Sequence, residues 1–413
     1  MIRSSAIYYA LFLSIIMGVI LGSMVLLSAL NKELAMKLEL PVRLMENAES
    51  GMAYAMVNHA ELENGQQLAI SLFDGEMDSV TLSKKYWGAL TILQAKAHHK
   101  GQFFERACIA GIEQKKEDVN LYVVDNGRQI SIAGETRLEG NCYLPSGGLK
   151  RAYIAGENYK GSQLLYGSRF KANRSLPAIN QELIEKLTPP QANIISWEEA
   201  QDSMVVNFSE TPQQFISDGT ISIDHHYLKG AIWIEAKDSV FIGRDCQIEE
   251  AVIKAPIIFV ESGFRGNVQL LATDRITLEE EVLLEYPSVM AVVEESANNK
   301  QPAEIEVGEG TQVIGSVFMV REGFDQRNMP LLSIAKEAEI DGLVYCQGKT
   351  ELKGTVNGSL YTQKFYLKTQ SSSYENHILN GQVLDQLPAE FIYVDLLRNE
   401  NEYVPLKQMK LIQ

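Results

Sequence analysis

The sequence predicts a mainly β protein that begins with one long helix and continues into a stacked array of short strands. Three observations support this fold class. An uncharged apolar run covers residues 6–30, and an apolar stripe with helical spacing follows it. The chain turns β-rich from residue 67, and from Gly127 it shows short strands separated by Gly and Asn. We therefore expect a transmembrane and stalk α-helix followed by a β-solenoid (β-helix) head, with a β-sandwich as the alternative.

The apolar run has the properties of a membrane anchor. At about 1.5 Å per residue, residues 6–30 are long enough to cross a hydrocarbon core about 30 Å thick. Tyr8 and Tyr9 stand where amphipathic rings favour the membrane interface. A cleaved signal peptide, with an apolar region of about 7–15 residues, is the alternative. Arg3 precedes the run and Lys32 follows it, and the slight positive excess at the N-terminus favours a cytoplasmic N-terminus and a periplasmic or extracellular bulk.

Small and apolar residues mark two packing surfaces on this helix. Gly18 and Gly22 form a small-xxx-small pair, a spacing that permits close approach of two helices in a membrane. Beyond the membrane, alternating steps of three and four residues define one helical face. The stripe on that face comprises Leu38, Pro41, Met45, Ala48, Met52 and Ala55. Pro41 is expected to kink or restart the helix. The candidate packing and assembly residues are Gly18, Gly22, Pro41, Met45, Ala48, Met52 and Ala55.

The N-terminal part resembles a known stalk. An apolar anchor that runs into a long amphipathic helix, with NAESGMAYAM at residues 47–56, resembles the stalk of type IV pilin-like proteins, above all the minor pilins and minor pseudopilins. In that family the stalks pack side by side to build or prime a filament. The family's Gly before the apolar run and its Glu at the fifth position are absent from MIRSSAIYYALF. A simple bitopic anchor with a membrane-proximal helix is the alternative.

The chain divides into segments that differ in their residue pattern. We expect a transmembrane anchor at 1–30, a stalk helix at 31–64, a small antiparallel β unit at 65–126, first β-coils with a helical linker insertion at 127–218, a β-solenoid at 219–370 and a C-terminal cap at 371–413. The similar strands AIWIEA (231–236) and PIIFVE (256–261) start 25 residues apart, near the length of one solenoid coil. KGTVNGSLYTQ (353–363) resembles the bactofilins, which are polymer-forming β-helix proteins.

The search for chemistry identifies no catalytic, cofactor-binding or metal-binding residue. Asp224-His225-His226 is the most site-like cluster, but neighbouring residues of a strand point to opposite faces, which favours a surface turn. The four cysteines, which form no CxxC pair, are expected to be buried thiols, with one disulfide as the alternative. They are Cys108, Cys142, Cys246 and Cys346. A net charge of −16 argues against nucleic-acid binding.

Two functions from different classes are compatible with these patterns. The first is a non-enzymatic bitopic envelope protein that serves as an assembly or scaffold component of a pilus-like or secretion-type filament, with the membrane and other proteins, or copies of itself, as partners. The alternative is a surface polysaccharide-binding or polysaccharide-cleaving β-helix protein. Its carboxylate candidates are Glu279, Glu280, Glu281 and Glu285, and its aromatic candidates are Trp233 and Tyr286.

Overall fold

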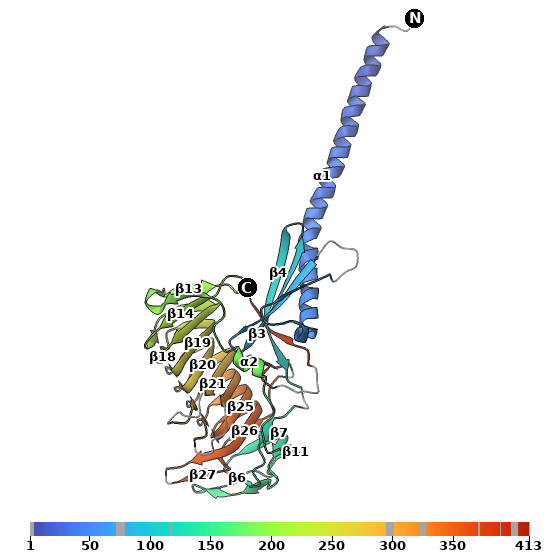
Figure 1. The fold of residues 1–413 in the computed structure, drawn as a ribbon. Helices are drawn as coiled ribbons and strands as arrows, with labels where there is room; N and C mark the ends of the chain where they lie inside the picture. The colour runs from blue at the N-terminus through green and yellow to red at the C-terminus, as the bar shows by residue number, and fades with distance from the viewer. Residues whose placement is uncertain are drawn as a thin grey trace.

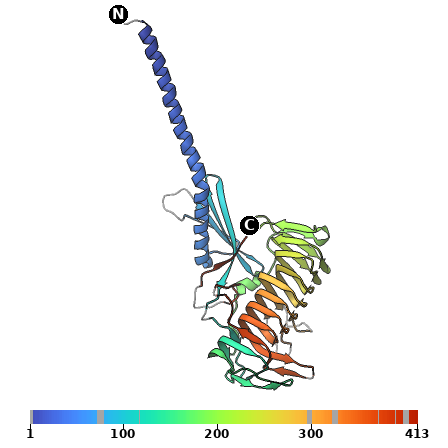
Figure 2. The same cartoon turned by 180° about the vertical axis from the view of Figure 1, so that it is seen from behind.

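The computed structural model describes residues 4–71, 79–115, 118–294, 301–321, 328–370, 372–388, 390–397 and 404–412. The chain is mainly β, with one long N-terminal helix, α1 (Ser4–Val57), that projects from a β-rich head (Figures 1 and 2). The head contains an antiparallel sheet, on which the inner half of α1 rests, and a column of parallel strands beside that sheet. The coarse fold class expected from the sequence is therefore confirmed.

Helix α1 is continuous over 54 residues and runs through Pro41, so the predicted restart does not occur. Proline removes one backbone donor, and the carbonyl that loses its partner belongs to Lys37. Both residues lie on an exposed stretch of the helix, so this carbonyl is not shut away in the protein core. A short 3₁₀ turn, η1 (His59–Glu61), follows α1 and leads into the sheet.

The antiparallel sheet has the strand order β1–β2–β3–β4, and two strands from the C-terminal region extend it beside β4. Its members are β1 (Gln67–Ile70), β2 (Ser79–Trp87), β3 (Leu90–His99), β4 (Gln102–Glu113), β30 (Ile392–Tyr393) and β31 (Lys407–Ile412). Leu44 and Met52 of α1 pack with Leu82 and Leu93 of this sheet. A Cβ on Gly51 would lie 2.6 Å from Val80 Cγ1, so the absence of a side chain allows this close packing.

The column is built from strands that pair in parallel with strands later in the chain. In chain order they are β12 (Asn193–Ser196), β13 (Ser203–Val206), β14 (Gln213–Ser217), β15 (Ile221–Ile223), β16 (Tyr227–Gly230), β17 (Ile232–Ala236), β18 (Ser239–Ile242), β19 (Gln247–Val260), β20 (Arg265–Leu278), β21 (Leu283–Glu294), β22 (Glu304–Val307), β23 (Gln312–Arg321), β24 (Leu331–Ile334), β25 (Glu339–Leu352) and β26 (Thr355–Lys368). Among the described residues, the antiparallel strand pairing that a sandwich requires occurs only in the sheet beside α1 and in two short pairs, residues 153–154 with 157–158 and residues 366–368 with 373–375. One isolated antiparallel bridge joins Ile179 to Leu397.

One row of inward-facing side chains shows how the column is filled. Each member is the registered partner of the next, and all but the two end residues are buried. The row is Ile195, Phe215, Ile234, Ile253, Leu270, Met290, Val317, Val344, Leu360, Leu121, Cys142 and Arg169. Stacking of apolar residues at one register gives a continuous core. Arg169, on the last strand of the row, ends it with a charge.

The far end of the column is built from two parts of the chain, residues 121–171 and residues 373–384. Its strands are β5 (Leu121–Val123), β6 (Ile130–Ala133), β7 (Arg137–Leu144), β8 (Leu149–Arg151), β9 (Tyr153–Ile154), β10 (Glu157–Asn158), β11 (Tyr166–Lys171), β27 (Ser373–Glu375), β28 (His377–Leu379) and β29 (Gln382–Leu384). Strand β5 pairs in parallel with β26, so residues 121–171 extend the column beyond β26. We call this the distal end, because it lies farthest from the N-terminus of α1 (Figures 1 and 2).

A crossing segment, residues 172–192, connects the distal coils to the opposite end of the column. Tyr122 Oη donates to Ser175 O at 3.1 Å and Tyr345 Oη donates to Pro177 O at 3.0 Å, which holds the start of this segment against the column. It contains the short helix α2 (Gln181–Glu185). A second short helix, η2 (Trp197–Glu199), follows β12.

The register corrects one sequence-based inference. AIWIEA and PIIFVE are not equivalent positions of neighbouring coils, because Trp233 pairs with Val252, 19 positions later, whereas Ile257 pairs with Ser239. The two similar segments therefore occupy different positions in the pairing of the column. Residues 371–413, expected as a cap, divide between the distal coils and the α1 sheet.

Candidate functional site

The outer half of α1 is the first candidate site. Every residue from Ile7 to Glu39 is exposed, and most of those up to Leu30 are Leu, Ile, Val, Met or aromatic. Within the described residues, α1 is the one helix long and apolar enough to cross a membrane. Exposing apolar surface to water costs about 25 cal/mol per Å², so this segment is stabilised by an apolar environment.

The predicted assembly residues fall into two groups. Ala48, Met52 and Ala55 are buried against the sheet, so intramolecular packing occupies this part of the stripe. Leu38 is 69% exposed and Met45 is 38% exposed. The stripe is therefore not one surface, and only its membrane-proximal part is accessible to a partner.

The remaining assembly candidates lie in the exposed part of α1. A Cβ on Gly18 or Gly22 would have no neighbouring atom within 4 Å. Pro41 is also exposed. These three positions make no packing contact with the head, so contact with another molecule is sterically open to them.

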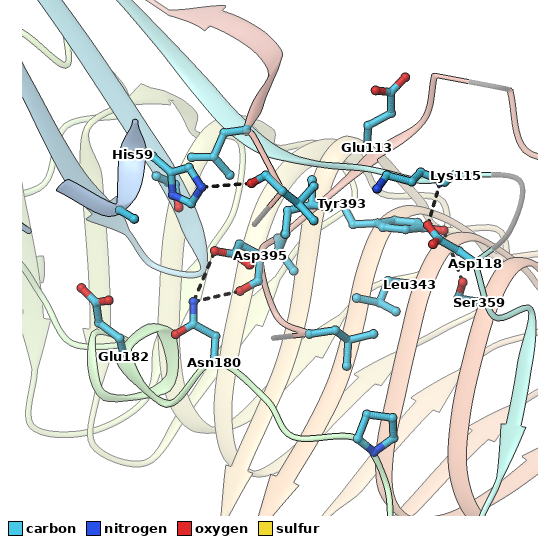
Figure 3. Close-up of a pocket in the computed structure, with 18 of the residues that line it drawn as sticks. His59, Glu113, Lys115, Asp118, Asn180, Glu182, Leu343, Ser359, Tyr393 and Asp395 are labelled. Atoms are coloured by element: carbon cyan, nitrogen blue, oxygen red, sulfur yellow. Dashed lines mark hydrogen bonds between the residues drawn. The ribbon is translucent and has the colours of Figure 1, made fainter. Parts of the chain in front are cut away.

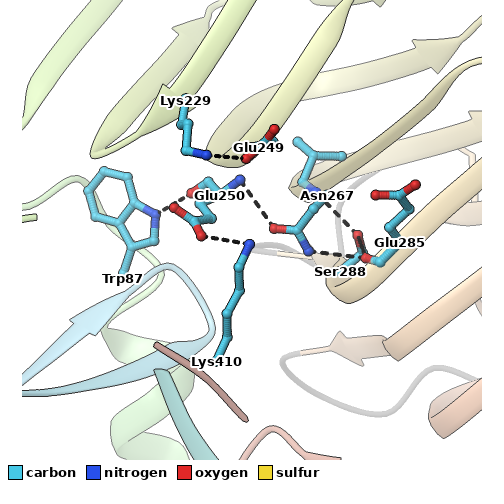
Figure 4. A network of polar contacts seen from close by, with 9 residues as sticks. Trp87, Lys229, Glu249, Glu250, Asn267, Glu285, Ser288 and Lys410 are labelled. Carbon is cyan, nitrogen blue, oxygen red and sulfur yellow. Dashed lines mark hydrogen bonds and ion pairs between the residues drawn. The ribbon is translucent and has the colours of Figure 1, made fainter. Parts of the chain in front are cut away.

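The second candidate is the joint between the α1 sheet and the column (Figure 4). Trp87, at the end of β2, donates its indole Nε1–H to Glu250 O at 2.7 Å. Gln269 Oε1 accepts the N–H of Ala89 at 2.8 Å, and Gln269 Nε2 donates to Trp87 O at 2.8 Å. Lys410 of β31 forms an ion pair with Glu250 at 2.7 Å. These contacts bond the β2–β3 turn and β31 directly to β19 and β20.

A second layer of hydrogen bonds holds Glu250 in place. Its φ of 66° lies in the left-handed region, which is costly for a residue with a side chain. Asn267 Oδ1 accepts the N–H of Glu250 at 3.1 Å, and Asn267 Nδ2 donates to Glu285 O at 3.1 Å. Ser288 Oγ accepts the N–H of Val268 at 3.2 Å. The joint is thus a connected and largely buried network, which favours one fixed geometry.

Two aromatic residues considered for glycan contact lie at this joint instead. Trp233 is fully buried and meets Trp87 edge-to-face at 5.9 Å between ring centroids. Tyr286 Oη donates to Ile392 O at 3.0 Å, and burial raises the pKa of Tyr286. The Trp233 ring is therefore not available as a stacking surface for a sugar, and the half-buried Tyr286 is engaged through its hydroxyl.

A cavity of about 510 Å³ opens where the sheet, the column and the crossing segment meet (Figure 3). Lys84, 6% exposed, donates from Nζ to His59 O at 3.1 Å. The His59 ring Nε2 lies 3.1 Å from Val404 O. Asn180 Nδ2 donates to Asp395 O at 3.2 Å. These hydrogen bonds connect η1 and the crossing segment to the C-terminal region. The polar residues that line the cavity therefore have structural roles.

The residues weighed for metal or acid–base chemistry lie apart. In the described part of the chain, no group of three or more His, Cys, Asp or Glu side chains is arranged to hold a metal ion. His225 occupies an exposed turn with φ 57°, and its Nδ1 lies 3.9 Å from Asp245 Oδ2. Glu279 Oε2 accepts the N–H of Ser262 at 3.0 Å, a contact that shapes a turn. Glu280, Glu281 and Glu285 are exposed.

All four cysteines are free and buried, as the sequence interpretation predicted. Burial raises the pKa of Cys108, Cys142 and Cys346 to about 12. The pKa of Cys246 is also raised by burial. Because the thiolate is the nucleophilic form, these side chains are inert packing residues.

No known protein family, curated protein or solved structure matches this chain. The pilin-like and bactofilin-like resemblances therefore rest on the sequence segments given above. The geometry of α1, the joint and the column carries the functional argument.

Proposed function

We propose that the protein is a non-enzymatic, single-pass envelope protein that scaffolds assembly, as a component of a pilus-like or secretion-type filament. Its head is proposed to be a β-solenoid, and its N-terminus to be cytoplasmic with the head on the opposite side of the membrane. The observation that carries the proposal is that one uninterrupted helix joins an exposed apolar half to a half buried in the head.

The column supports the solenoid interpretation through its register. Leu270 pairs with Met290, Met290 with Val317 and Val317 with Val344, all in parallel and all buried. A solenoid is stabilised by contacts between successive coils, and a row of registered, buried residues supports this interpretation. A rigid body of this kind suits a structural role.

The joint supports a rigid mechanical connection between the membrane helix and the column. Lys410, Trp87 and Gln269 bond the sheet to the column, and the same sheet buries Met52 of α1. The anchor, stalk and head therefore form one mechanical unit. Such a unit sets the height and orientation of the column above the membrane.

The accessible stalk supports self-association. Leu34, Leu38, Val42 and Met45 are exposed at steps of four, four and three, so they share one side of α1. They lie between the membrane segment and the head. A second stalk packed along this side would cover them, as the pilin-like resemblance implies.

Cysteine labelling tests the anchor and its orientation, because the native thiols are buried. We would introduce Ser162→Cys in the exposed distal end and label intact cells and opened cells with a membrane-impermeant maleimide. Labelling in intact cells, or after permeabilising only an outer membrane, is expected if the head lies outside the cytoplasm. Recovery of the protein in the soluble fraction would overturn the anchor, and labelling only after the cytoplasm is opened would overturn the orientation.

Disulfide crosslinking in membranes tests the stalk contact. Leu38→Cys lies on the exposed stripe, and Met36→Cys, two residues away and on the opposite side of the helix, is the matched control. We expect covalent dimers from Leu38→Cys and few from Met36→Cys. Equal yields from both variants, or no dimers from either, would contradict the proposed contact.

A further inference from the structure

A second cavity, of about 880 Å³, lies between the crossing segment and strands β25 and β26 near the distal end. The elements that flank it are labelled in Figure 1. Arg128, Arg174 and Lys364 line it, and Glu375 is the one carboxylate among its lining residues. We call it the basic groove. Its excess of positive charge contrasts with the net charge of −16 of the whole chain.

The charge at the basic groove is only partly neutralised. Glu375 forms ion pairs with both Lys364, at 2.5 Å, and Arg128, at 3.5 Å. Lys349 of β25 is the registered partner of Lys364 on β26, which brings two like charges side by side. Burial and the nearby Lys364 ammonium lower the pKa of Lys349. Lys349 Nζ lies 5.2 Å from the centroid of the Tyr366 ring. Arg174 lines the cavity and forms no ion pair with a carboxylate in the described part of the chain.

The part of the chain that forms the distal end is also rich in positive charge. Residues 121–174, which contain the distal coils, hold eight Lys and Arg against four Asp and Glu. Arg169 and Lys171 on β11 lie at the register of buried Cys142 and Leu144 on β7, so they face the open end of the core. Inward-pointing charges on a terminal strand oppose the addition of another strand. They leave a basic surface at this end.

The polar lining of the groove distinguishes among anionic ligands. Gln181 and Gln363 present amides, which donate and accept hydrogen bonds and suit hydroxyl groups. The aromatic ring in the lining, Tyr345, is 1% exposed, so it offers no face on which a nucleobase could stack. Cations with amides and without a stacking ring favour a hydroxyl-rich anion.

We propose that the basic groove binds an acidic saccharide, a sugar chain that carries carboxylate or phosphate groups. The anionic group contacts Lys364 and Arg174, and the sugar hydroxyls contact the amides. Groove volumes of about 300–1,000 Å³ are typical of ligand sites. This binding does not depend on the membrane topology or on the assembly role proposed above.

Calorimetry on the full chain in detergent micelles tests the proposal. The probes are hexagalacturonate for carboxylates, mannose 6-phosphate for phosphate, maltohexaose as the neutral saccharide and oligo(dT) as the nucleic acid. We expect one or both acidic saccharides to bind, with an affinity that falls as salt increases, and maltohexaose not to bind. The comparison of hexagalacturonate with mannose 6-phosphate identifies the anionic group.

Arg174→Gln and Lys364→Gln are expected to weaken binding roughly tenfold or more each, because charge-assisted hydrogen bonds are lost. Lys160→Gln, a distal exposed lysine paired with Glu135 and absent from the groove, is the matched control and should bind as the unmodified chain does. Arg174 forms no ion pair in the described residues, so its variant reports on binding even if Lys364→Gln unfolds. Binding of neither acidic saccharide, equal affinity in Arg174→Gln and Lys160→Gln, or tighter binding of oligo(dT) would overturn the proposal.

Discussion

Trp87 donates its indole N–H to the main-chain carbonyl of Glu250 at 2.7 Å, although 163 positions separate the two residues in the chain. This bond joins the sheet that carries the stalk to the column. Buried donors and acceptors that lose their partner cost about 1–3 kcal/mol, so the bond constrains the joint more strongly than its net contribution to stability indicates.

Trp87→Phe removes the donor and keeps an aromatic ring. We expect a loss of about 1–3 kcal/mol in the free energy of unfolding, because Glu250 O is left buried without its partner. Thermal unfolding of the full chain in detergent measures it. Trp197→Phe, at a half-buried indole outside the joint, is the control. An equal shift in both variants would remove the special role assigned to Trp87.

Gly51→Leu tests the contact between α1 and the sheet. Its side chain would collide with Val80, and overpacking of this kind costs about 1–3 kcal/mol. Ala53→Leu, on the exposed side of the same helix, should leave stability within about 0.5 kcal/mol. Chemical denaturation followed by circular dichroism distinguishes the two. Equal stability of Gly51→Leu and Ala53→Leu would show that the helix does not pack as closely as described.

Glu339 provides a pH-dependent test. Burial, and then the neighbouring Asp341 carboxylate, raise the pKa of Glu339 above 4.5, while Asn357 Nδ2, which donates to both carboxylates, opposes the rise. The stability that this group contributes is therefore complete below pH 4.5 and is lost as pH increases through the folded-state pKa. Glu339→Gln, which cannot ionise, should melt higher than the unmodified chain at pH 7.

The melting temperature measured from pH 4 to pH 8 checks this prediction. The difference between Glu339→Gln and the unmodified chain should shrink toward pH 4.5. Glu337→Gln is the control, because the Lys336 ammonium lowers the pKa of that exposed carboxylate. A Glu339→Gln variant that is less stable than the unmodified chain at pH 7 would show that the ionised carboxylate is needed.

The native cysteines are expected to resist alkylation. With a pKa of about 12, roughly one Cys142 thiol in ten thousand is ionised at pH 8. Intact-mass measurement after treatment with a maleimide should show no label on the folded chain and four labels after denaturation. The Leu38→Cys variant should gain one label while folded. Rapid labelling of the native chain would show that a cysteine-bearing strand opens.

The elements that depend on local spacing could be predicted from the sequence. The uncharged run and the stripe through Ala48, Met52 and Ala55 identify α1, because helical periodicity is a property of neighbouring residues. Which surface buries that stripe was not predictable, because the sheet that covers it includes β31, a strand about 300 positions later in the chain.

Elements that depend on long-range pairing were not predictable. The length of a coil changes along the column, with Trp233 pairing 19 positions ahead and Arg275 pairing 29 ahead, so no fixed period marks the register. In the sequence, the joint is indicated only weakly, by an isolated polar residue such as Gln269 inside an apolar strand. The basic groove has a clearer one, which is the excess of Lys and Arg in residues 121–174 of an acidic chain.

The pairing of β31 with β4 also has a consequence for synthesis. Ile109 of β4 meets Lys410 of β31, 301 positions later, so the sheet beneath the stalk stays incomplete while most of the chain is being made. Contacts of such long range fold slowly. A product that stops before β31 would keep the edge of β4 unpaired and open to aggregation. Closure of the sheet beneath the stalk thus has to wait until β31 has been synthesised.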